Sequence, residues 1–263
     1  LWDEALPKLK FTSAFPFLDD RYYFPRPLLP IPDFTHELAL EYGKILKRAR
    51  YVDHFSFMKW QQGEPFDLGK MALAERELDE VLTTGVRPQV MLDRLTNDSG
   101  LNFVGETSFL RNHKCGLYFL VDVEPEDWPK LQATMRFLGD EGIGGRRSLG
   151  YGVFEPEFET ELPFKVVDAP DAFLTLSLVY PANTEEYEAH LAYQLVERMG
   201  WIESLGGNQA LRHQRVLMFG EGSVFSKPIQ GKIVDVAPPE FKAHPVYRSG
   251  VAFNVGVRLG DDE

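Results

Sequence analysis

The stretch GIGGRRSLGYG at residues 142–152 constrains the fold of this chain more than any other segment. It holds five glycines, and glycine adopts positive φ and permits close backbone approach at little steric cost. Apolar side chains recur at spacings of three and four over 128–138, which predicts a helix directly before the glycines. We expect strands at 116–123, before this helix, and at 151–159, after the glycines. Strand, helix, glycine-rich turn and strand form half of a ferredoxin-like unit.

A second unit of the same kind follows in the sequence. The segment 172–181 predicts a strand, and 183–200 predicts a helix with apolar residues on one face. Asn183 is a good N-cap and Glu186 lies three residues further on, as a capping box prefers. Short strands with glycines between them follow, and the last is expected at 250–259.

The two units predict an α+β fold with two tandem ferredoxin-like (RRM-like) domains, residues 1–163 and 164–263. A β-hairpin at about 87–113 is expected as an insertion in the first domain. Its turn is predicted at 97–100, where Asn, Asp, Ser and Gly are all strong turn formers.

Three other segments complete the first domain. Five prolines over 13–32 remove backbone donors and fix φ, so this segment is expected to be extended. A helix is expected at about 36–50. The polar and charged residues 61–80 predict an excursion over the surface.

The formal net charge of −12 excludes binding of nucleic acid by general electrostatic attraction. Any RNA contact therefore needs basic groups that are concentrated locally, or a positive field supplied by a partner. Cys115 is the only cysteine, which excludes disulfides within the chain and cysteine-cluster metal sites and fits a reducing, cytoplasmic compartment. No apolar run approaches the roughly 18 residues that span a bilayer, so no membrane contact is expected.

The glycine-rich loop carries groups that suit an RNA backbone. Its amides can form an anion-binding nest, and Arg146 and Arg147 add planar cationic donors for phosphate. Ser148 adds a hydroxyl and Tyr151 a stacking surface. The alternative is a flexible surface turn.

The motifs of nucleotide-binding enzymes do not match this loop. No Gly-Lys-Ser/Thr occurs, which excludes the P-loop pattern. The position three residues after Gly144 is Arg147 and not glycine, so the dinucleotide-binding pattern fails as well. We therefore expect no nucleotide cofactor and no resident metal ion.

Four segments carry a resemblance to a known family. GDEGIGGRRSLGYGVFE at 139–155 resembles the glycine-rich loop of RAMP proteins, the ferredoxin-like RNA-binding subunits of CRISPR systems. FTSAFPF (11–17), DRLTNDSG (93–100) and HPVYRSG (244–250) are similar to the RAMP subunit that caps the 5′ end of the guide in type III-A (Csm) effector complexes. The equivalent subunit of type III-B (Cmr) complexes is the nearest alternative.

The resemblance implies a non-catalytic subunit that binds the 5′ handle of the CRISPR RNA (crRNA). It also implies two protein partners, the large signalling subunit and the backbone RAMP subunit, and no homo-oligomer of the chain by itself. Members of this family open with a strand and a helix before the SAFPF segment. The ten residues LWDEALPKLK are too short for both, so we expect that the sequence given lacks them.

The resemblance also transfers the RNA-binding role to individual residues. The loop that cradles the handle corresponds to Gly142, Gly144, Gly145, Arg146, Arg147, Ser148, Gly150, Tyr151 and Gly152. The hairpin corresponds to the family's thumb, which pushes between nucleotides. Its cationic residues are expected to contact phosphate: Arg87, Arg94, Arg111, His113 and Lys114. Met91, Leu92 and Leu95 either wedge between bases or pack the hairpin on its own domain.

The predicted second domain holds a weaker candidate. FGEGSVFSKPIQG at 219–231 forms either a second RNA-facing loop or a plain β-turn, and the residues concerned are Gly220, Gly222, Ser223 and Lys227. ALRHQRV at 210–216 and HPVYRSG also carry cations, which contact either RNA or neighbouring acids.

Two other functions remain open at this point. A RAMP endoribonuclease that processes precursor crRNA needs a histidine as general acid or base, and His54 is the first candidate. Metal-dependent cleavage at Asp93 or Asp98 is conceivable, although turn capping explains Asp98 better. A scaffold without RNA contact leaves the arginines of the loop without a purpose.

Overall fold

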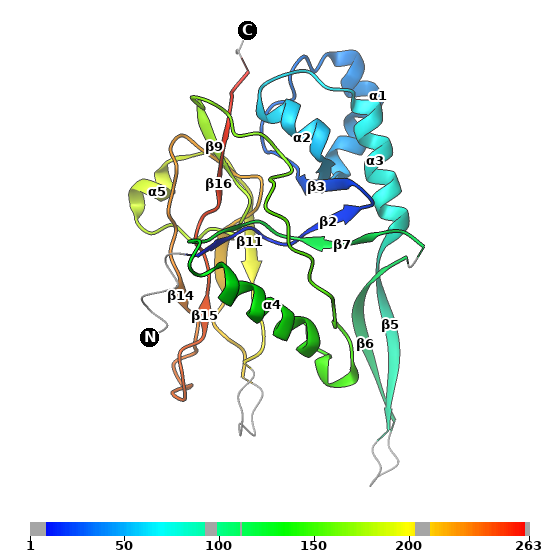
Figure 1. The fold of residues 1–263 in the computed structure, drawn as a ribbon, viewed down its shortest axis with the longest axis vertical. Helices are drawn as coiled ribbons and strands as arrows, with labels where there is room; N and C mark the ends of the chain where they lie inside the picture. The colour runs from blue at the N-terminus through cyan, green and yellow to red at the C-terminus, as the bar shows by residue number, and fades with distance from the viewer. Residues whose placement is uncertain (1–8, 93–98, 111, 203–210, 261–263) are drawn as a thin grey trace.

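The computed structural model describes residues 9–92, 99–110, 112–202 and 211–260. Each half of the chain holds one four-stranded antiparallel sheet, so the fold is mixed α and β as the sequence predicts (Figure 1). The strand order is β4-β3-β2-β7 in the first sheet and β10-β13-β9-β16 in the second.

The first sheet lies in the N-terminal half. It is formed by β2 (Phe15–Leu18), β3 (Arg21–Pro25), β4 (Tyr51–Asp53) and β7 (Cys115–Tyr118). Because the proline-rich segment supplies β2 and β3, its predicted extended conformation is confirmed. The helix expected at 36–50 is also confirmed as α1 (His36–Arg48), which starts where the Thr35 side chain accepts a hydrogen bond from the Leu38 N–H. A second helix, α2 (His54–Gln61), packs against β3 and β4.

The prediction of a surface excursion over 61–80 is wrong. Residues Leu68–Val81 form helix α3, which starts where the Asp67 carboxylate accepts a hydrogen bond from the Lys70 N–H at 3.1 Å. Met71, Ala74 and Leu78 recur at helical spacing and are buried against the sheet, while the charged residues between them face solvent. The high charge of this segment belongs to the outer face of an amphipathic helix.

The long hairpin is confirmed, and it begins earlier than predicted. Strand β5 (Leu82–Leu92) continues directly from α3 and pairs along its whole length with β6 (Ser99–Phe109). The hairpin projects from the body of the molecule (Figure 1). Residues 97 and 98 of the predicted turn lie outside the described residues, and Ser99 and Gly100 belong to β6.

The buried strand expected at 116–123 is divided in two and is not buried. Its first part is β7, and its second part is β8 (Val121–Asp122), which pairs with β1 (Lys10–Phe11). Strand β7 is the edge of the first sheet, so one of its sides is open and Leu117 remains 47% exposed.

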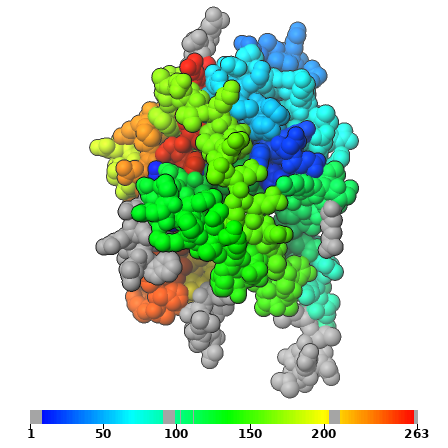
Figure 2. Space-filling view, viewed as in Figure 1, coloured from blue at the N-terminus to red at the C-terminus, as the bar shows by residue number. Residues whose placement is uncertain are grey.

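Helix α4 (Trp128–Glu141) confirms the helix predicted before the glycines. The strand predicted at 151–159 is wrong, because this segment is extended but pairs with no strand. It packs on α4 instead: the Phe154 N–H donates to the Gly139 carbonyl at 3.1 Å, and the rings of Trp128 and Phe158 are in edge contact. In Figure 2, α4 (green) lies across the front of the molecule, and the yellow-green segment that follows runs upward between the red C-terminal strand and the blue and cyan N-terminal part.

The second sheet lies in the C-terminal half. It is formed by β9 (Ala172–Thr175), β10 (His190–Ala192), β13 (Val224–Phe225) and β16 (Asn254–Val257). Strands are therefore present within the segments 172–181 and 250–259, as predicted. Two small two-stranded ribbons accompany this sheet: β11 (Leu195–Arg198) with β12 (Val216–Phe219), and β14 (Val234–Asp235) with β15 (Tyr247–Arg248).

The helix predicted over 183–200 is mostly wrong. Its start is right, because Asn183 accepts a hydrogen bond from the Glu186 N–H, but α5 covers only Thr184–Glu188. The following residues form β10 and β11, which pair with β13 and β12. Helical spacing of apolar residues gives only a weak local preference. Here, pairing with distant strands outweighs that preference and sets the secondary structure.

One hydrophobic core joins the two halves of the chain. It contains Phe24, Phe57 and Trp60 from the first half and Leu174 and Val255 from the second, all less than 6% exposed. Backbone hydrogen bonds also cross between the halves, for example from Ser13 N to Leu176 O at 2.9 Å. The division at residues 163 and 164 stays a prediction. No helix among the described residues combines the length and apolar character that crossing a bilayer requires.

Candidate nucleic-acid interface

The glycine-rich loop begins where α4 ends. The N–H of Gly142 donates to the Leu138 carbonyl at 2.8 Å, and φ of Gly142 is +80°, which turns the chain out of the helix. The Ile143 N–H then donates to the Gly152 carbonyl at 2.9 Å and closes the loop. Between these ends, Arg147–Leu149 form one turn of 3₁₀ helix.

Two glycines are required by this closure. A Cβ on Gly152 would lie 1.8 Å from the Ile143 carbonyl oxygen, and one on Gly142 would lie 2.9 Å from the Tyr151 carbonyl oxygen. Gly144, Gly145 and Gly150 meet no atom within 4 Å, so they present bare backbone to the surroundings. The sequence therefore folds here into a closed loop with an open outer surface.

The outer surface of the loop carries the predicted RNA-binding side chains. Arg147, Ser148 and Tyr151 are exposed, and Arg146 is half-buried. The Arg146 guanidinium donates a hydrogen bond to Gln89 Oε1 at 2.5 Å. Because Gln89 lies on β5, this bond joins the loop to the hairpin and brings the two predicted sites together.

The hairpin has two different faces. The strand register places Arg87 and Gln89 on the same face, the one that meets Arg146. The opposite face is apolar and exposed, and it is formed by Val86, Pro88, Val90, Leu101 and Phe103. Sequence reasoning selected Arg87 but missed Gln89, which the two-residue alternation of a strand would have placed beside Arg87. Of the other hairpin predictions, Arg94, Leu95 and Arg111 lie outside the described residues, as do the side chains of Met91 and Leu92.

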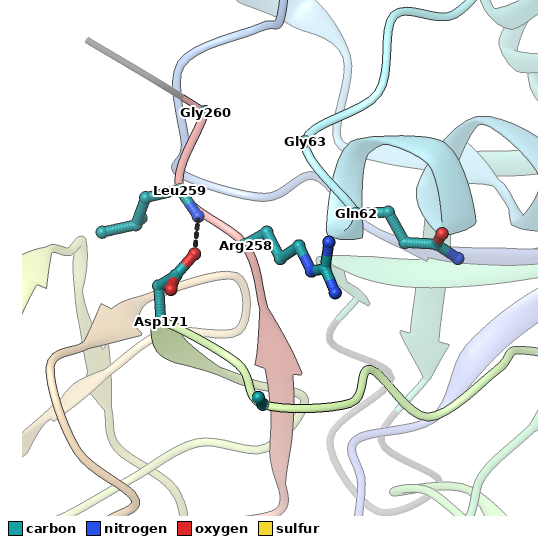
Figure 3. Close-up of a pocket in the computed structure, with 7 residues that line it drawn as sticks. Gln62, Gly63, Asp171, Arg258, Leu259 and Gly260 are labelled. Atoms are coloured by element: carbon teal, nitrogen blue, oxygen red, sulfur yellow. Dashed lines mark hydrogen bonds between the residues drawn. The ribbon is translucent and has the colours of Figure 1, made fainter.

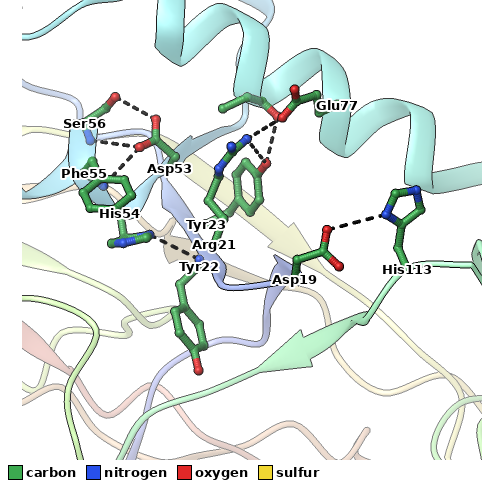
Figure 4. Close-up of polar contacts among 11 residues, drawn as sticks. Asp19, Arg21, Tyr22, Tyr23, Asp53, His54, Phe55, Ser56, Glu77 and His113 are labelled. Carbon is green, nitrogen blue, oxygen red and sulfur yellow. Dashed lines mark hydrogen bonds and ion pairs between the residues drawn. The ribbon is translucent and has the colours of Figure 1, made fainter.

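The base of the hairpin is held by acidic residues. His113 Nδ1 lies 3.5 Å from Asp19 Oδ2 (Figure 4), and Lys114 Nζ lies 3.0 Å from Glu157 Oε2. The hydrogen bond that Lys114 donates to Glu157 raises the pKa of Lys114. The structure therefore gives both predicted phosphate ligands a partner within the chain.

The second glycine-containing loop faces the first half of the chain. Gly220, Gly222 and Ser223 are buried, and the N–H of Leu28 donates to the Gly222 carbonyl at 3.0 Å. Of the four predicted residues, only Lys227 is exposed, and its Nζ lies 3.5 Å from Glu185 Oε2. Of the two alternatives for 219–231, the structure favours the turn.

His54, the candidate for nuclease chemistry, joins two elements of the first half (Figure 4). Its Nδ1 accepts a hydrogen bond from the Tyr22 N–H at 3.3 Å, and burial lowers its pKa. The neighbouring Asp53 carboxylate caps α2 by accepting from the N–H groups of Phe55 and Ser56. These contacts explain both side chains structurally.

A depression of about 340 Å³ lies where the end of α2 meets the C-terminal segment (Figure 3). Its side chains include Gln62, Asp171 and Arg258, and the Asp171 carboxylate accepts a hydrogen bond from the Leu259 N–H. Over the described part of the chain, no three His, Cys, Asp or Glu side chains gather where they could hold a metal ion.

The comparisons with known proteins identify the family of this chain. The sequence model of the CRISPR Csm4 C-terminal domain matches residues 168–257. A CRISPR system Cms protein Csm4 of Thermococcus onnurineus is 31% identical over 98% of this chain and 83% of its own length. The Csm4 protein of Streptococcus thermophilus is 26% identical over 89% of this chain and 76% of its own length. The chain belongs to the Csm4 family of type III-A subunits.

Solved structures share the fold. A chain in the crystal structure of a Csm1–Csm4 cassette in complex with cA4 superposes with a TM-score of 0.66, at 24% identity over 99% of this chain and 83% of that one. A chain in the crystal structure of a Csm3–Csm4 subcomplex of the type III-A interference complex gives 0.65, at 17% identity over 97% of this chain and 86% of that one.

Proposed function

We propose that this chain is the crRNA-binding subunit of a type III-A Csm complex and that it holds the 5′ handle. The observation that carries the proposal is the exposed arginine-bearing loop at 142–152, joined to the polar face of the hairpin by the Arg146–Gln89 hydrogen bond. Bare amides, guanidinium groups and an exposed tyrosine are the groups that bind a single RNA strand. They are concentrated locally, as a chain of net charge −12 requires.

The partners proposed for this chain are the large subunit Csm1 and the backbone subunit Csm3. Solved structures of similar fold contain Csm4 with each of these two proteins. A subunit in this position links the large subunit to the filament. The excess acidic side chains of this chain then face solvent or basic surfaces of its partners.

We infer that the chain has no catalytic role. His54 and Asp53 are used in joining β3 to α2 and in capping that helix. Asp93 and Asp98 lie outside the described residues. The finer description of the fold as two tandem ferredoxin-like domains is also part of this proposal, supported by one four-stranded antiparallel sheet in each half. A cytoplasmic location stays a prediction.

The test removes both arginines of the loop. We expect Arg146→Ala with Arg147→Ala to lower the guide content of the assembled complex without unfolding the chain. Each lost phosphate contact should also reduce the dependence of log affinity on log salt by about one. Guide content is measured as the ratio of extracted RNA to protein after purification of the whole complex.

A matched variant removes two positive charges elsewhere. Lys70→Ala with Arg76→Ala acts on the exposed face of α3, where both side chains are more than three-quarters exposed. This control should leave the guide content unchanged. Normal guide content in the Arg146 and Arg147 double variant would overturn the proposal.

A further inference from the structure

The second half of the chain holds a group of cations that the proposed function does not use. The two ribbons, β11–β12 and β14–β15, are joined by a small apolar cluster that contains Val216, Met218 and Val236. Arg198 is paired with Val216 in the first ribbon, and Arg248 lies on β15 in the second. The charge of Arg198 acts on Arg248, so the two guanidinium groups lie near each other at the junction of the ribbons.

A shift in register brings a histidine to the same place. The pairing of β11 with β12 moves by one residue between the Arg198–Val216 pair and the isolated bridge of Trp201 with Arg212. Such a bulge redirects side chains, and His213 is only 7% exposed here. Its Nδ1 lies 2.8 Å from the Gln214 carbonyl oxygen, so Nδ1 donates and Nε2 accepts from Arg248 Nη2 at 3.5 Å.

The two guanidinium groups have no counter-ion within the described part of the chain. Arg248 Nε is buried without a hydrogen-bond partner, and neither Arg198 nor Arg248 forms an ion pair with a described residue. Burial, and then the charge of Arg198, lower the pKa of Arg248. The chain has 40 acidic and 28 basic side chains, yet no described acidic side chain pairs with these two arginines. Uncompensated neighbouring cations of this kind are stabilised by an anion from outside.

An exposed aromatic ring lies beside these cations. Trp201 is 61% exposed, and the Arg212 guanidinium lies 4.6 Å from the centre of its ring. Trp201 follows Gly200 in the sequence. The Gly200 carbonyl accepts a hydrogen bond from the His213 N–H at 3.1 Å, so backbone pairing brings Trp201 near His213 and the arginines beside it. An exposed indole next to guanidinium groups is a stacking platform for a nucleic-acid base.

We propose that the second half of this chain carries its own contact for single-stranded RNA, with a phosphate bound at Arg198 and Arg248 and a base stacked on Trp201. The RNA is taken to be the guide, so this inference rests on the proposed function. The β11–β12 and β14–β15 ribbons reach toward the same end of the molecule as the β5–β6 hairpin (Figure 1). An acidic protein segment would neutralise the guanidinium groups but would leave the tryptophan unused, which favours RNA.

The experiment uses the whole complex assembled on a guide that contains 4-thiouridine in its handle. Photo-crosslinking followed by mass spectrometry should give adducts on residues 198–202 or 211–215 as well as in the loop at 142–152. Trp201→Ala with Arg198→Gln should reduce guide retention in high salt about tenfold, which lies within the range expected for loss of one stacked base. Val166→Ala with Lys165→Gln changes one exposed apolar and one basic side chain of the same half, outside the proposed contact, and should leave retention unchanged.

The outcomes separate this inference from the proposed function. Adducts in the loop alone, with normal retention in the Trp201 variant, would overturn the inference and leave the proposed function intact. Adducts in neither place would overturn both. If Arg198→Gln by itself releases a protein subunit while the guide stays bound, the site is a protein interface and the inference is wrong. Thermal unfolding of each variant chain verifies that the fold is retained.

Discussion

The loops at 142–152 and 219–231 both combine positive-φ glycines with basic residues, yet they face different surroundings. In the first loop, the glycines that meet an atom at close range, Gly142 and Gly152, meet backbone of the same loop, and the arginines remain at the surface. In the second, a Cβ on Gly222 would lie 2.3 Å from the Arg26 carbonyl oxygen, in the other half of the chain. The first loop therefore leaves bare backbone and arginines open to the surroundings, and the second holds the two halves together.

The comparison shows what glycine in a loop can and cannot indicate. Glycine at positive φ means that some group comes close to bare backbone. The glycine does not say whether that group is another molecule or another part of the chain. Substitutions in the two loops should therefore affect different properties, stability in one and RNA binding in the other.

The largest effect is expected for Gly222→Ala. Its φ of +86° is unfavourable for alanine, and the new methyl group would strike a backbone carbonyl that cannot move without shifting β3. We expect a loss of about 3 kcal/mol in the free energy of unfolding, or a fall of roughly 6–12 °C in Tm. The control is Gly144→Ala, where φ is +95° but space is open, so only about 1 kcal/mol should be lost. Equal stability of the two variants, measured calorimetrically, would break the comparison.

Glu186→Gln tests the contact that holds the far end of the second loop, at Gln230 and Gly231. The buried Glu186 carboxylate accepts from the N–H groups of Ala182, Gln230 and Gly231. Burial raises the pKa of Glu186, but these three donors and the charge of Lys227 outweigh burial and lower the pKa below its usual value. A neutral amide offers one acceptor oxygen, so the variant should lose about 2 kcal/mol of stability at pH 7.

The same carboxylate predicts a dependence on pH. Because the folded-state pKa of Glu186 is depressed, its stabilisation is complete above the unfolded-state pKa of about 4.3 and is lost as pH falls through the folded value. As pH falls from 7 to 3, the free energy of unfolding, measured by chemical denaturation, should therefore decline less for Glu186→Gln than for the natural chain. Glu185→Gln, at the exposed neighbour, is the control and should decline like the natural chain. An equal decline of stability with pH in the natural chain and both variants would contradict the assignment of this pH dependence to Glu186.

Gly152→Ala should affect RNA binding more than stability. Its methyl group would strike the Ile143 carbonyl and open the closure of the first loop. The loop lies at the surface and can shift, so the distortion should displace Arg146 and Arg147 and lower RNA affinity about tenfold, or about 1.4 kcal/mol. The measurement is guide retention by the assembled complex, beside Tm of the chain. A large fall in Tm with normal retention would reverse the comparison.

The smallest effect is expected for Gln89→Ala. This change removes the acceptor of the Arg146 hydrogen bond and leaves the arginine in place. A hydrogen bond at an exposed site contributes about 0.5–1 kcal/mol to holding the Arg146 side chain in position. Its loss should therefore lower guide retention roughly two- to fivefold. Thr84→Ala, on the opposite face of the same strand, is the matched control and should have no effect. Retention unchanged in both would show that the loop acts without the hairpin.

The sequence by itself determined the features that depend on neighbouring residues. Helix α4 before the glycines, the Asn183 cap, the extended proline-rich segment and the β5–β6 hairpin were all predicted. Each follows from periodicity, capping or backbone restriction within a few positions, so distant segments were not needed to specify it. The Arg-bearing loop was likewise located by its composition.

Tertiary structure decided everything that depends on a partner far along the chain. Strand pairing ended α5 after Glu188, and packing on α4 kept residues 151–159 out of a sheet. The burial of Ser223 and the Arg146–Gln89 bond each join segments dozens of residues apart. Local propensities differ by less than about 1 kcal/mol per residue, whereas burial of one large apolar side chain contributes about 1.5–3 kcal/mol. Long-range packing therefore outweighs local preference wherever the two compete.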